Sequence, residues 1–517
     1  MELSVPYILS KCQSLFPGAH LIWLNMTKLK RKIWGGILAT VITLAIIGAT
    51  LGISYLLAKP TQLSMLQATA QNYGTIDLDC HYSENNHTLA VKQCTTYINH
   101  TDRNLTEVKF HIYANAYQKD AQAPAVAKTD IADAYPNGFD PGYIKVTTPH
   151  TVINGTDNTV LTVPLTKAIT PGASTKIDLE YTIKLANVKH RLGYTQNAVN
   201  LGNFYAIPVV YDNDWEIYPY SYNGDPFYNE PYNFNVTMDA PAGYTIASSG
   251  EPVGKNQYRG YLLRDFAMVL SRDFKLLTRS VGDTTVKYYY LNDEIPEVSL
   301  YTACNALAYF SNQFINYPYS TLSVVQTDFQ HGGMEYGTLV YASLDVTDQV
   351  QYQTVIVHEI AHQWWYGLVG NNQNHTPWID EGLAEYSTAV FFETHPQYGK
   401  TLESIATENQ QNIAMFERIM NDYHVSFSRA MNKYLDEYRL QSEYTINTYV
   451  RGMLLFYYIT DMVGYQNLNH ALAQFAQANC YQFGDMYELS STLEANLGKD
   501  LVKYINNYLA GNQPAVV

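Results

Sequence analysis

One stretch of the chain, from Ile33 to Ala58, contains 26 residues without a charged side chain and is rich in Ile, Leu, Ala, Val and Gly. A helix of that length, at about 1.5 Å per residue, exceeds the roughly 30 Å hydrocarbon core of a bilayer. It is longer than the apolar core of an ordinary signal peptide, and no clear A-x-A cleavage site follows it. Residues 33–58 are therefore predicted to form a transmembrane helix, with a cleaved signal peptide as the alternative.

Basic side chains gather on one side of this segment. Only Lys59 stands close after it, whereas the preceding side carries Lys28, Lys30, Arg31 and Lys32. The positive-inside rule places residues 1–32 in the cytoplasm and the remainder outside, as in a single-pass protein of the cell membrane. Residues 59–72 are expected to form a polar stalk. The sequence from Met26 (MTKLKRKIWGG) has the form of a membrane-anchor start, so the true start could be Met26.

The bulk composition limits the class of protein. A chain of 517 residues exceeds what one hydrophobic core usually supports, so two or three domains are expected. The net charge is −15, and no basic run occurs outside the N-terminus, which argues against nucleic acid as a partner. The five cysteines contain no CxxC pair, so neither a cysteine zinc site nor thioredoxin-type chemistry is expected.

Hydrophobic residues alternate with polar ones through residues 73–283. Turn-forming clusters such as NGTDN and APAG separate the alternating runs. This period of two predicts an all-β domain of packed sheets. The residues expected to share strand faces are Ile76, Leu78, Cys80 and Tyr82; Val108, Phe110, Ile112 and Ala114; Ile177, Leu179, Tyr181, Ile183 and Leu185; and Phe234, Val236 and Met238.

Two cysteines flank a polar turn at residues 84–87. If the turn is centred there, Cys80 and Cys94 would lie nearly opposite each other on a hairpin. In an exported protein these two cysteines could form a disulfide, and two unpaired thiols are an equal alternative.

The periodicity becomes helical in residues 284–517. It appears in SLYTACNALAYFSNQF and VIVHEIAHQWW, and the chain is mostly helical after Pro396. Three amphipathic helices are predicted, in GMLLFYYITDMV, NHALAQFAQA and ELSSTLEANLGKDLVKYINNYLAG. The fold class is thus a multidomain α+β protein: a transmembrane helix, an all-β domain, and a mixed α/β domain that ends in helices.

The segment HEIAH offers a metal site. His358 and His362 stand four residues apart, so on a helix their imidazoles share one face and can bind one zinc ion. Eighteen residues separate His362 from Glu381, which would supply a third ligand. The motif alone is a modest signal, but its apolar flanks make unpaired charged groups costly there. Glu359, beside the first ligand, can reach a water molecule at the metal.

Three ordered motifs resemble the aminopeptidase N family of thermolysin-like (gluzincin) zinc peptidases. They are HEIAH with the glutamate of DEGLAEY, the segment HGGMEYG (residues 331–337), and YTINTYVRG (residues 444–452). Residues 332–336 of the second segment resemble the family's GxMEN motif and end 22 residues before His358. The resemblance implies that residues 284–517 are a thermolysin-like domain holding one Zn²⁺ per chain and acting on peptides outside the cell.

Residue roles follow from this resemblance. Glu359 would accept the proton of water and pass it to the leaving amine. Tyr449 would donate a hydrogen bond to the oxyanion. Glu335 would bind the substrate's α-ammonium group, while the backbone of Gly332 and Gly333 lines the peptide. Glu385 would orient a zinc-binding histidine, or else is a surface glutamate. No second carboxylate for the amine is evident.

The sequence also departs from the family. Tyr336 replaces the asparagine of the family motif, which is expected to change the pocket. The chain resembles a short form without the helical C-terminal domain of long members, so a partner or an oligomer could complete an open site. Besides an aminopeptidase, a zinc endopeptidase and a non-catalytic binding protein at the cell surface stay open.

Overall fold

The computed structural model describes residues 62–512 and the separate positions Thr27, Lys28, Lys30, Ile37, Thr40, Val41 and Thr43. The predicted cytoplasmic segment 1–32 and transmembrane helix 33–58 otherwise lie outside the described residues. Among the residues that are described, no helix combines the length and the apolar character needed to cross a bilayer. The chain divides into two units, Met1–Met65 and Leu66–Val517.

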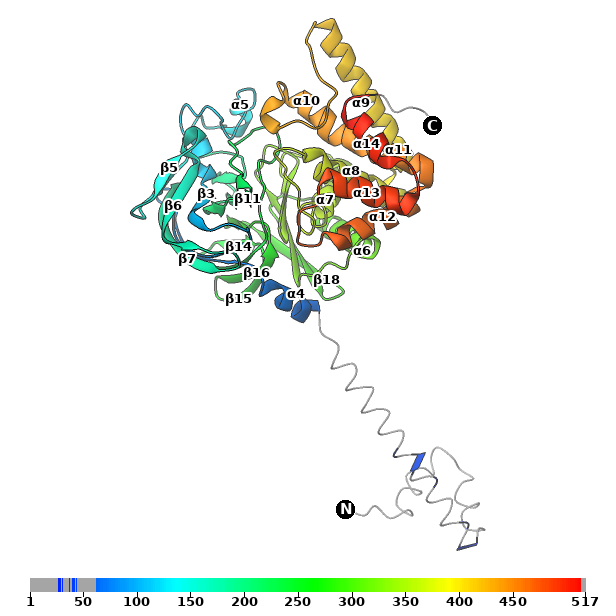
Figure 1. The fold of residues 1–517 in the computed structure, drawn as a ribbon, viewed down its shortest axis with the longest axis horizontal. Helices are drawn as coiled ribbons and strands as arrows, with labels where there is room; N and C mark the ends of the chain where they lie inside the picture. The colour runs from blue at the N-terminus through cyan, green and yellow to red at the C-terminus, as the bar shows by residue number, and fades with distance from the viewer. Residues whose placement is uncertain are drawn as a thin grey trace. The chain divides into compact units, whose positions relative to one another are not determined.

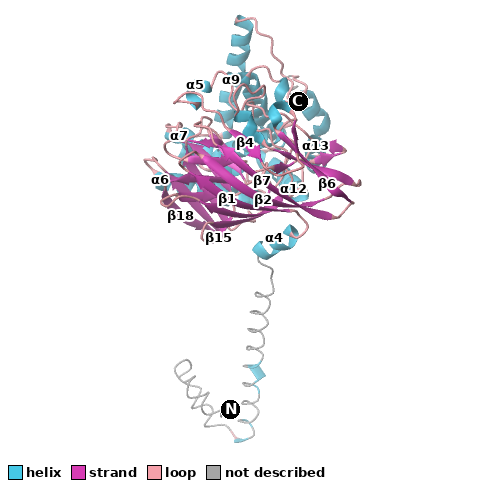
Figure 2. Ribbon diagram, turned by 90° about the vertical axis from the view of Figure 1, so that its left-hand side faces the viewer, coloured by secondary structure: helices cyan, strands magenta, loops and turns pink. Residues whose placement is uncertain are grey.

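The alternating sequence of the first half builds a large sheet (Figure 2). Strand β1 (Thr75–Ser83) buries every second residue from Ile76 to Tyr82, as predicted, because one face of the sheet meets the core. The sheet has seven strands, in the order β15 (Glu251–Gly254), β16 (Gln257–Leu263), β13 (Tyr232–Asp239), β1, β2 (Thr88–Ile98), β7 (Ser174–Lys184) and β4 (Tyr143–Val146). Of these strands, β1, β2, β7, β4 and β15 are labelled in Figure 2.

Smaller sheets complete this β region. One has the order β10 (Ile207–Pro208), β3 (Leu105–His111), β6 (Val160–Ile169) and β5 (Val152–Asn154). Another has the order β14 (Thr245–Ser248), β17 (Ala267–Ser271), β9 (Val199–Gly202) and β8 (Leu192–Tyr194), and β11 (Tyr211–Asp212) pairs with β12 (Asp214–Trp215). Short helices are η1 (Tyr113–Tyr117), α5 (Ile131–Ala134) and η2 (Thr156–Asn158). Ala114, expected on a strand, lies in η1 because pairing of β3 with β6 ends at His111.

The strand register corrects the expectation for the two cysteines. Cys80 pairs with Val91, and Cys94 pairs with Asp77, so the cysteines are not opposite each other. Cys80 lies on the buried face of the sheet, whereas Cys94 lies on the opposite, less buried face. All four cysteines of the described residues are free, which agrees with the unpaired alternative.

The predicted stalk is helical in its described part. Helix α4 (Gln62–Ala70) buries Leu66 and Ala70. The backbone carbonyl of Ala70 also accepts a hydrogen bond from the Asn233 side chain on β13. These apolar residues at i and i+4 lie on one helix face, so residues 66–70 pack as part of the folded unit and do not form a polar tether.

The second half builds a mixed sheet covered by helices (Figure 1). Its strand order is β18 (Lys275–Val281), β19 (Thr284–Tyr290), β20 (Thr321–Thr327), β22 (Leu339–Ser343) and β21 (Gly333–Tyr336). The predicted domain boundary after residue 283 falls in the turn of the β18–β19 hairpin. Strand β21 lies at the edge of this sheet and runs antiparallel to β22. Helices α6 (Pro296–Gln313) and α7 (Gln349–Ala361) pack on the sheet.

Helices make up most of the chain after α7. They are α8 (Pro377–Thr394), η3 (Pro396–Tyr398), α9 (Leu402–Asp422), η4 (Leu435–Glu437), α10 (Gln441–Thr445), η5 (Ile446–Val450), α11 (Arg451–Val463), α12 (Tyr465–Ala478), α13 (Met486–Leu497) and α14 (Leu501–Leu509). The last predicted helix is two helices, because Gly498 ends α13 in a left-handed conformation (φ 65°).

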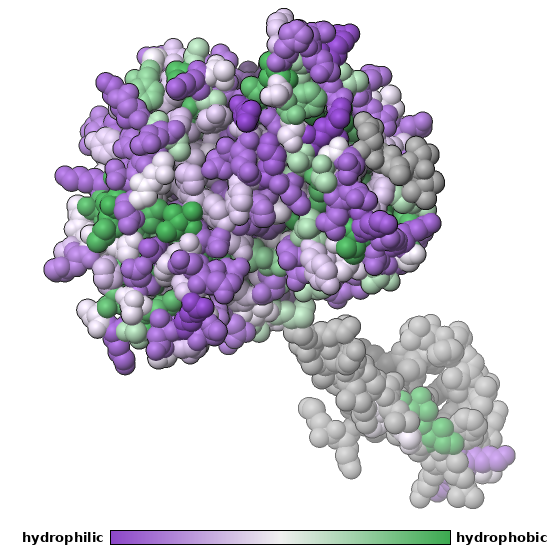
Figure 3. Space-filling model, turned by 45° about the horizontal axis from the view of Figure 1, so that its top comes forward, coloured by the Kyte–Doolittle hydropathy of each residue, from purple (hydrophilic) through white to green (hydrophobic). Residues whose placement is uncertain are grey.

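The core runs through both halves of the folded unit. Trp364, Trp365 and Trp378 are among its largest fully buried side chains. Burial of each large apolar side chain contributes about 1.5–3 kcal/mol, so these residues stabilise the segment that follows α7 and the start of α8. Hydrophilic side chains cover most of the face drawn in Figure 3, and hydrophobic ones form small, separate groups.

Candidate active site

Helix α7 carries the first residues of the predicted metal site. Its N-terminus is capped by Asp348, whose side chain accepts a hydrogen bond from the backbone N–H of Gln351. The helix ends at Ala361, but the next residue, His362, keeps helical dihedral angles (φ −64°, ψ −15°). His362 therefore lies one turn beyond His358 on the same face, as the spacing predicts.

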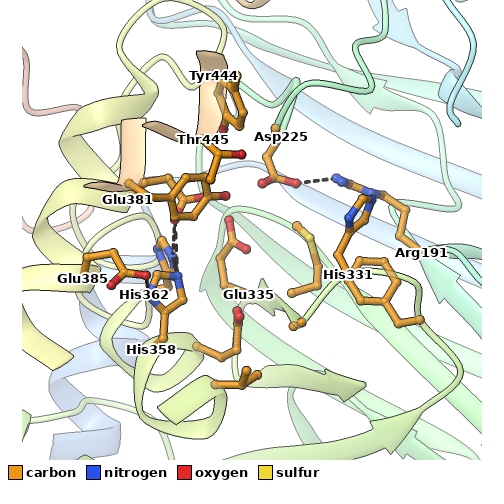
Figure 4. A pocket seen from close by; sticks show the side chains of 18 of the residues that line it. Arg191, Asp225, His331, Glu335, His358, His362, Glu381, Glu385, Tyr444 and Thr445 are labelled. Atoms are coloured by element: carbon orange, nitrogen blue, oxygen red, sulfur yellow. Dashed lines mark hydrogen bonds and ion pairs between the residues drawn. The ribbon is translucent and has the colours of Figure 1, made fainter. Parts of the chain in front are cut away.

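Three donor atoms from α7 and α8 converge (Figure 4). His362 Nε2 lies 3.1 Å from His358 Nε2 and 3.2 Å from Glu381 Oε2. His358 Nε2 lies 3.3 Å from the same carboxylate oxygen. The structure thus brings together the three residues that the sequence proposes as ligands.

In the neutral state that binds a metal, the groups beside the two Nδ1 atoms leave the Nε2 lone pairs of the histidines facing one another. His362 Nδ1 lies 2.9 Å from the carbonyl oxygen of Trp365, which only accepts, so Nδ1 carries the proton and Nε2 a lone pair. His358 Nδ1 makes no hydrogen bond, but it lies 3.3 Å from the carboxyl oxygen Oε1 of Glu385, which favours a proton on Nδ1. Two nitrogen lone pairs that face each other repel unless a cation lies between them. In a tetrahedral zinc site, bonds of about 2.0–2.1 Å separate ligand atoms by about 3.3–3.4 Å, and this spacing fits.

The cavity around the donors, of about 360 Å³, is strongly acidic. It contains one permanent cation, Arg191, against the carboxyl groups of Asp225, Glu335, Glu359, Glu381 and Glu385. Burial opposes a charge on His362, but the carboxylates of Glu335 and Glu381 outweigh it and raise the pKa of that imidazole well above its usual range. The excess of carboxylates makes the cavity suited to cationic ligands.

Glu359 lies beside the three donors, and its Oε2 atom has no hydrogen-bond partner. A side chain at Gly333 would bring its Cβ within 2.3 Å of Glu359 Oε1, so only glycine permits this approach of β21 to α7. Burial raises the pKa of Glu359 to about 7, although His358 and His362 act in the opposite direction. A carboxylate in this setting is able to exchange protons near neutral pH.

Glu335 enters the cavity from the edge strand β21. It is 3% exposed, and burial together with the Asp225 carboxylate raises its pKa well above the usual range. The amide nitrogen of Gln373 donates a hydrogen bond to Glu335 Oε1 at 3.1 Å. Asp225 faces this group across the cavity (Figure 4) and pairs with Arg191 at 2.6 Å. Two carboxyl groups thus lie beside the triad.

Tyr336 does not alter the cavity in the way expected. Side chains alternate along β21, so Tyr336 points away from the side of Glu335. It is fully buried, and a Cβ atom at Gly202 would meet its hydroxyl group at 1.9 Å. Its ring packs against Tyr341 at 5.0 Å between centroids. Among the described residues Tyr336 does not line the cavity, whereas Gly332 and Gly333 do.

Tyr449 comes from η5, a π-helical turn, and reaches the triad. Its hydroxyl group donates a hydrogen bond to Glu381 Oε1 at 2.6 Å, which leaves Oε2 of that carboxylate for the two histidines. Burial and the Glu381 charge raise the pKa of Tyr449 well above its usual range. The phenol therefore stays protonated and can donate. Tyr444, also in the cavity lining, packs edge-on to Tyr449 at 5.9 Å between ring centroids.

Two glycines set the distance between the helices that carry Glu381 and Tyr449. Gly382 of α8 and Gly452 of α11 face each other where the helices cross. A Cβ atom on Gly452 would lie 2.8 Å from Gly382 Cα, closer than side chains tolerate. The close crossing places the η5 turn within reach of the metal site.

Some residues of the site carried no usable signal in the sequence. Asp225 lies between β12 and β13 outside regular structure, and nothing local marks it as a neighbour of Glu335. Asp380 is visible beside Glu381 in the DEGLAEY segment, but its burial depends on amide donors that only the fold brings close. The one local hint was that Asp380 is an acidic residue in a largely apolar helix.

The three converging ligand residues are those expected of a zinc metallopeptidase. Residues 298–508 match the description "Peptidase family M1 domain", in agreement with the resemblance to the aminopeptidase N family. The fold is similar to that of the M1 zinc metallopeptidase from Deinococcus radiodurans, with a TM-score of 0.57 and 15% identity over 86% of this chain and 94% of that chain.

Curated relatives match over parts of their length. The membrane alanyl aminopeptidase of Manduca sexta is 26% identical over 184 residues, 34% of this chain and 18% of that protein. The alanine/arginine aminopeptidase of Saccharomyces cerevisiae is 23% identical over 287 residues, 53% of this chain and 32% of that protein. The human endoplasmic reticulum aminopeptidase 2 is 24% identical over 298 residues, 52% of this chain and 30% of that protein. The chain therefore spans less than a third of each of these three relatives.

Proposed function

We propose that this chain is a zinc-dependent aminopeptidase that releases N-terminal residues from peptides. The observation that carries the proposal is the position of two carboxyl groups, Glu335 and Asp225, beside the His358–His362–Glu381 triad. The triad suits a metal ion, and the pair Glu335 and Asp225 suits an α-ammonium group at a fixed distance from that ion. The curated relatives, named as aminopeptidases, support the same activity.

The zinc ligands are His358, His362 and Glu381. When bound, zinc polarises the scissile carbonyl and lowers the pKa of water. Glu385 positions the imidazole of His358 through its contact with Nδ1, as the Trp365 carbonyl does for His362. The alternative of a surface glutamate fits less well, because Glu385 lines the cavity.

Glu359 acts as the general base. Its unpartnered Oε2 is free to accept a proton from the attacking water, and a pKa of about 7 before metal binding makes the carboxyl able to give the proton up again. The proton then passes to the leaving amine. Tyr449 turns its hydroxyl donor from Glu381 to the oxygen of the scissile carbonyl as negative charge develops there.

Glu335 and Asp225 bind the free amine of the substrate. The substrate backbone lies along the edge strand β21, where Gly332 and Gly333 allow close approach. Because the ammonium subsite adjoins the metal, only the first peptide bond reaches the reacting groups. This arrangement favours an aminopeptidase over an endopeptidase. The expectation that a partner or a second copy completes the site stays a prediction.

Hydrolysis of fluorogenic amino-acid amides tests the function. The purified protein should cleave them, lose activity with 1,10-phenanthroline and recover it with added zinc, because the triad holds the metal. N-acetylation of the substrate should lower kcat/KM at least about 30-fold, since it removes the partner of buried carboxylates. Internal cleavage of N-acetylated peptides would instead assign an endopeptidase. Absence of stoichiometric zinc and of turnover would favour a binding protein.

We also propose that residues 33–58 anchor the enzyme in the cell membrane, with residues 1–32 in the cytoplasm and the M1 domain outside. The uncharged segment and the basic residues before it support this topology. The full chain should stay with membranes in alkaline carbonate, and a chain that lacks residues 1–58 should be soluble. In intact cells, added protease should digest the M1 domain. Carbonate-soluble full-length protein, or an M1 domain protected in intact cells, would contradict the anchor or its orientation.

A further inference from the structure

We propose that Gln373 is a positioning residue that holds Glu335 in place for the substrate amine. The inference rests on the proposed aminopeptidase function and adds a residue outside the three sequence motifs. Gln373 lies in the segment between α7 and α8 and is 1% exposed. It is not among the described residues that line the cavity, so it acts through Glu335 and does not touch the substrate.

One amide nitrogen of Gln373 joins two carboxyl groups. Gln373 Nε2 donates to Asp380 Oδ2 at 2.7 Å and to Glu335 Oε1 at 3.1 Å. An amide nitrogen has two hydrogens, so both bonds form at once. Oε1 of Glu335 is thereby occupied, and the second oxygen of that carboxyl is left for a ligand.

The orientation of the amide follows from its neighbours. In the reverse orientation, the Gln373 oxygen would face a carboxyl oxygen at each of these distances, and an ionised carboxylate there would repel it. In the observed orientation, Gln373 Oε1 is buried without a hydrogen-bond partner. An unpartnered buried acceptor lowers stability. The Gln373 amide therefore satisfies the two carboxyl groups, while its own oxygen stays without a hydrogen bond.

The other end of the bridge is firmly held. Asn371 Nδ2 donates to Asp380 Oδ1 at 2.9 Å and to the carbonyl oxygen of Thr376 at 3.0 Å. Asp380 precedes the ligand Glu381 on α8. The bridge through Gln373 thus ties the amine-binding carboxyl on β21 to the helix that carries a metal ligand.

The backbone of Gln373 makes a third connection. Its N–H donates to the carbonyl oxygen of Phe227 at 3.3 Å, two residues after Asp225. Gln373 therefore contacts the segments that carry Glu335, Asp225 and Glu381. These are the groups whose separation sets the distance from the amine subsite to the metal site.

Glu335 needs such a donor because its surroundings are acidic. Burial and the carboxyl groups of Asp225, Glu381 and Glu359 disfavour its ionised form, and His362 acts in the opposite direction. A hydrogen bond to the carboxylate favours that form and fixes its orientation. Without the amide, Glu335 would be free to turn away from its acidic neighbours, and it would then bind an ammonium group less well.

Paired inhibitors isolate this effect in the zinc-loaded enzyme. Leucine hydroxamate and its des-amino analogue, 4-methylpentanohydroxamic acid, share the metal-binding group and differ in the amine. Calorimetric titration of the wild type should show tighter binding of the amino compound. Gln373→Leu should lower this preference about tenfold, because a hydrogen bond to a charged group is lost. Its affinity for the des-amino analogue and its zinc content should not change.

Gln353→Leu provides a matched control. Gln353 is also a buried glutamine with an unpartnered Oε1, but its Nε2 donates to Ser299 Oγ at 3.0 Å and contacts no carboxyl group. The Gln353→Leu variant should prefer the amino compound as strongly as the wild type does. If Gln373→Leu does not fold, Gln373→Met keeps the length of the side chain without a donor and should behave as predicted for leucine.

The outcomes separate the two proposals. A wild type that binds both hydroxamates equally would overturn the amine subsite and with it the proposed function. A wild type that prefers the amine, with the preference unchanged in the Gln373 variants, would overturn only the role of Gln373. Equal weakening of both inhibitors, or loss of zinc, would show a general structural role and would also overturn it.

Discussion

Glu359→Gln should fold, bind zinc and lose almost all peptidase activity. The amide has the size of the carboxyl group, so it still fits beside Gly333, and the three metal ligands are unchanged. It cannot accept a proton from water, and loss of a general base lowers kcat by about 10²- to 10⁴-fold. Steady-state kinetics with an amino-acid amide, together with zinc analysis of the same sample, measures both properties.

Glu417→Gln controls for the substitution itself. Glu417 on α9 forms an ion pair with Arg429, outside the cavity. Activity should stay at the level of the wild type in this variant. Wild-type turnover by zinc-loaded Glu359→Gln would sink the proposed mechanism, and loss of zinc in that variant would mean that the residue supports metal binding.

Tyr449→Phe should lower kcat and leave KM nearly unchanged. The phenol is expected to donate to the oxyanion only as charge develops, so its removal acts on the transition state and hardly on binding. Loss of one such donor typically costs about 10²- to 10³-fold in kcat. Because the resting hydroxyl group contacts Glu381, the variant should be checked for full zinc content.

Tyr438→Phe is the matched control for the loss of a phenol. Tyr438 packs in the same hydrophobic cluster as Tyr444, against which Tyr449 lies, but its hydroxyl group bonds the carbonyl oxygen of Met431. Its kcat should be close to the wild-type value. A Tyr449→Phe enzyme with raised KM and normal kcat would assign the tyrosine to substrate binding.

Local patterns in the sequence predicted much of the fold and the metal site. The alternation around Ile76 predicted a strand because the period of two is a property of the strand itself. The spacing of His358, His362 and Glu381 predicted a cluster because two of the three share one helix face. In both cases the prediction rests on residues that are close together in the sequence.

Long-range geometry was not predictable in the same way. The register that separates Cys80 from Cys94 depends on where the turn begins, and a shift of a few residues changes every pair. Asp225 reaches Glu335 across more than a hundred residues of sequence, and Gln373 meets its carboxyl groups only after β21 and α8 have packed. The helix break at Gly498, by contrast, had a local signal in the glycine itself.

The crossing of α8 and α11 at Gly382 and Gly452 has a consequence for how this protein can vary. A larger residue at either position would push apart the helices that carry Glu381 and Tyr449. The same displacement would loosen the packing and misalign the reacting groups. Thermal tolerance and turnover therefore cannot be tuned separately at this contact, and random drift or laboratory selection for robustness has to preserve both glycines.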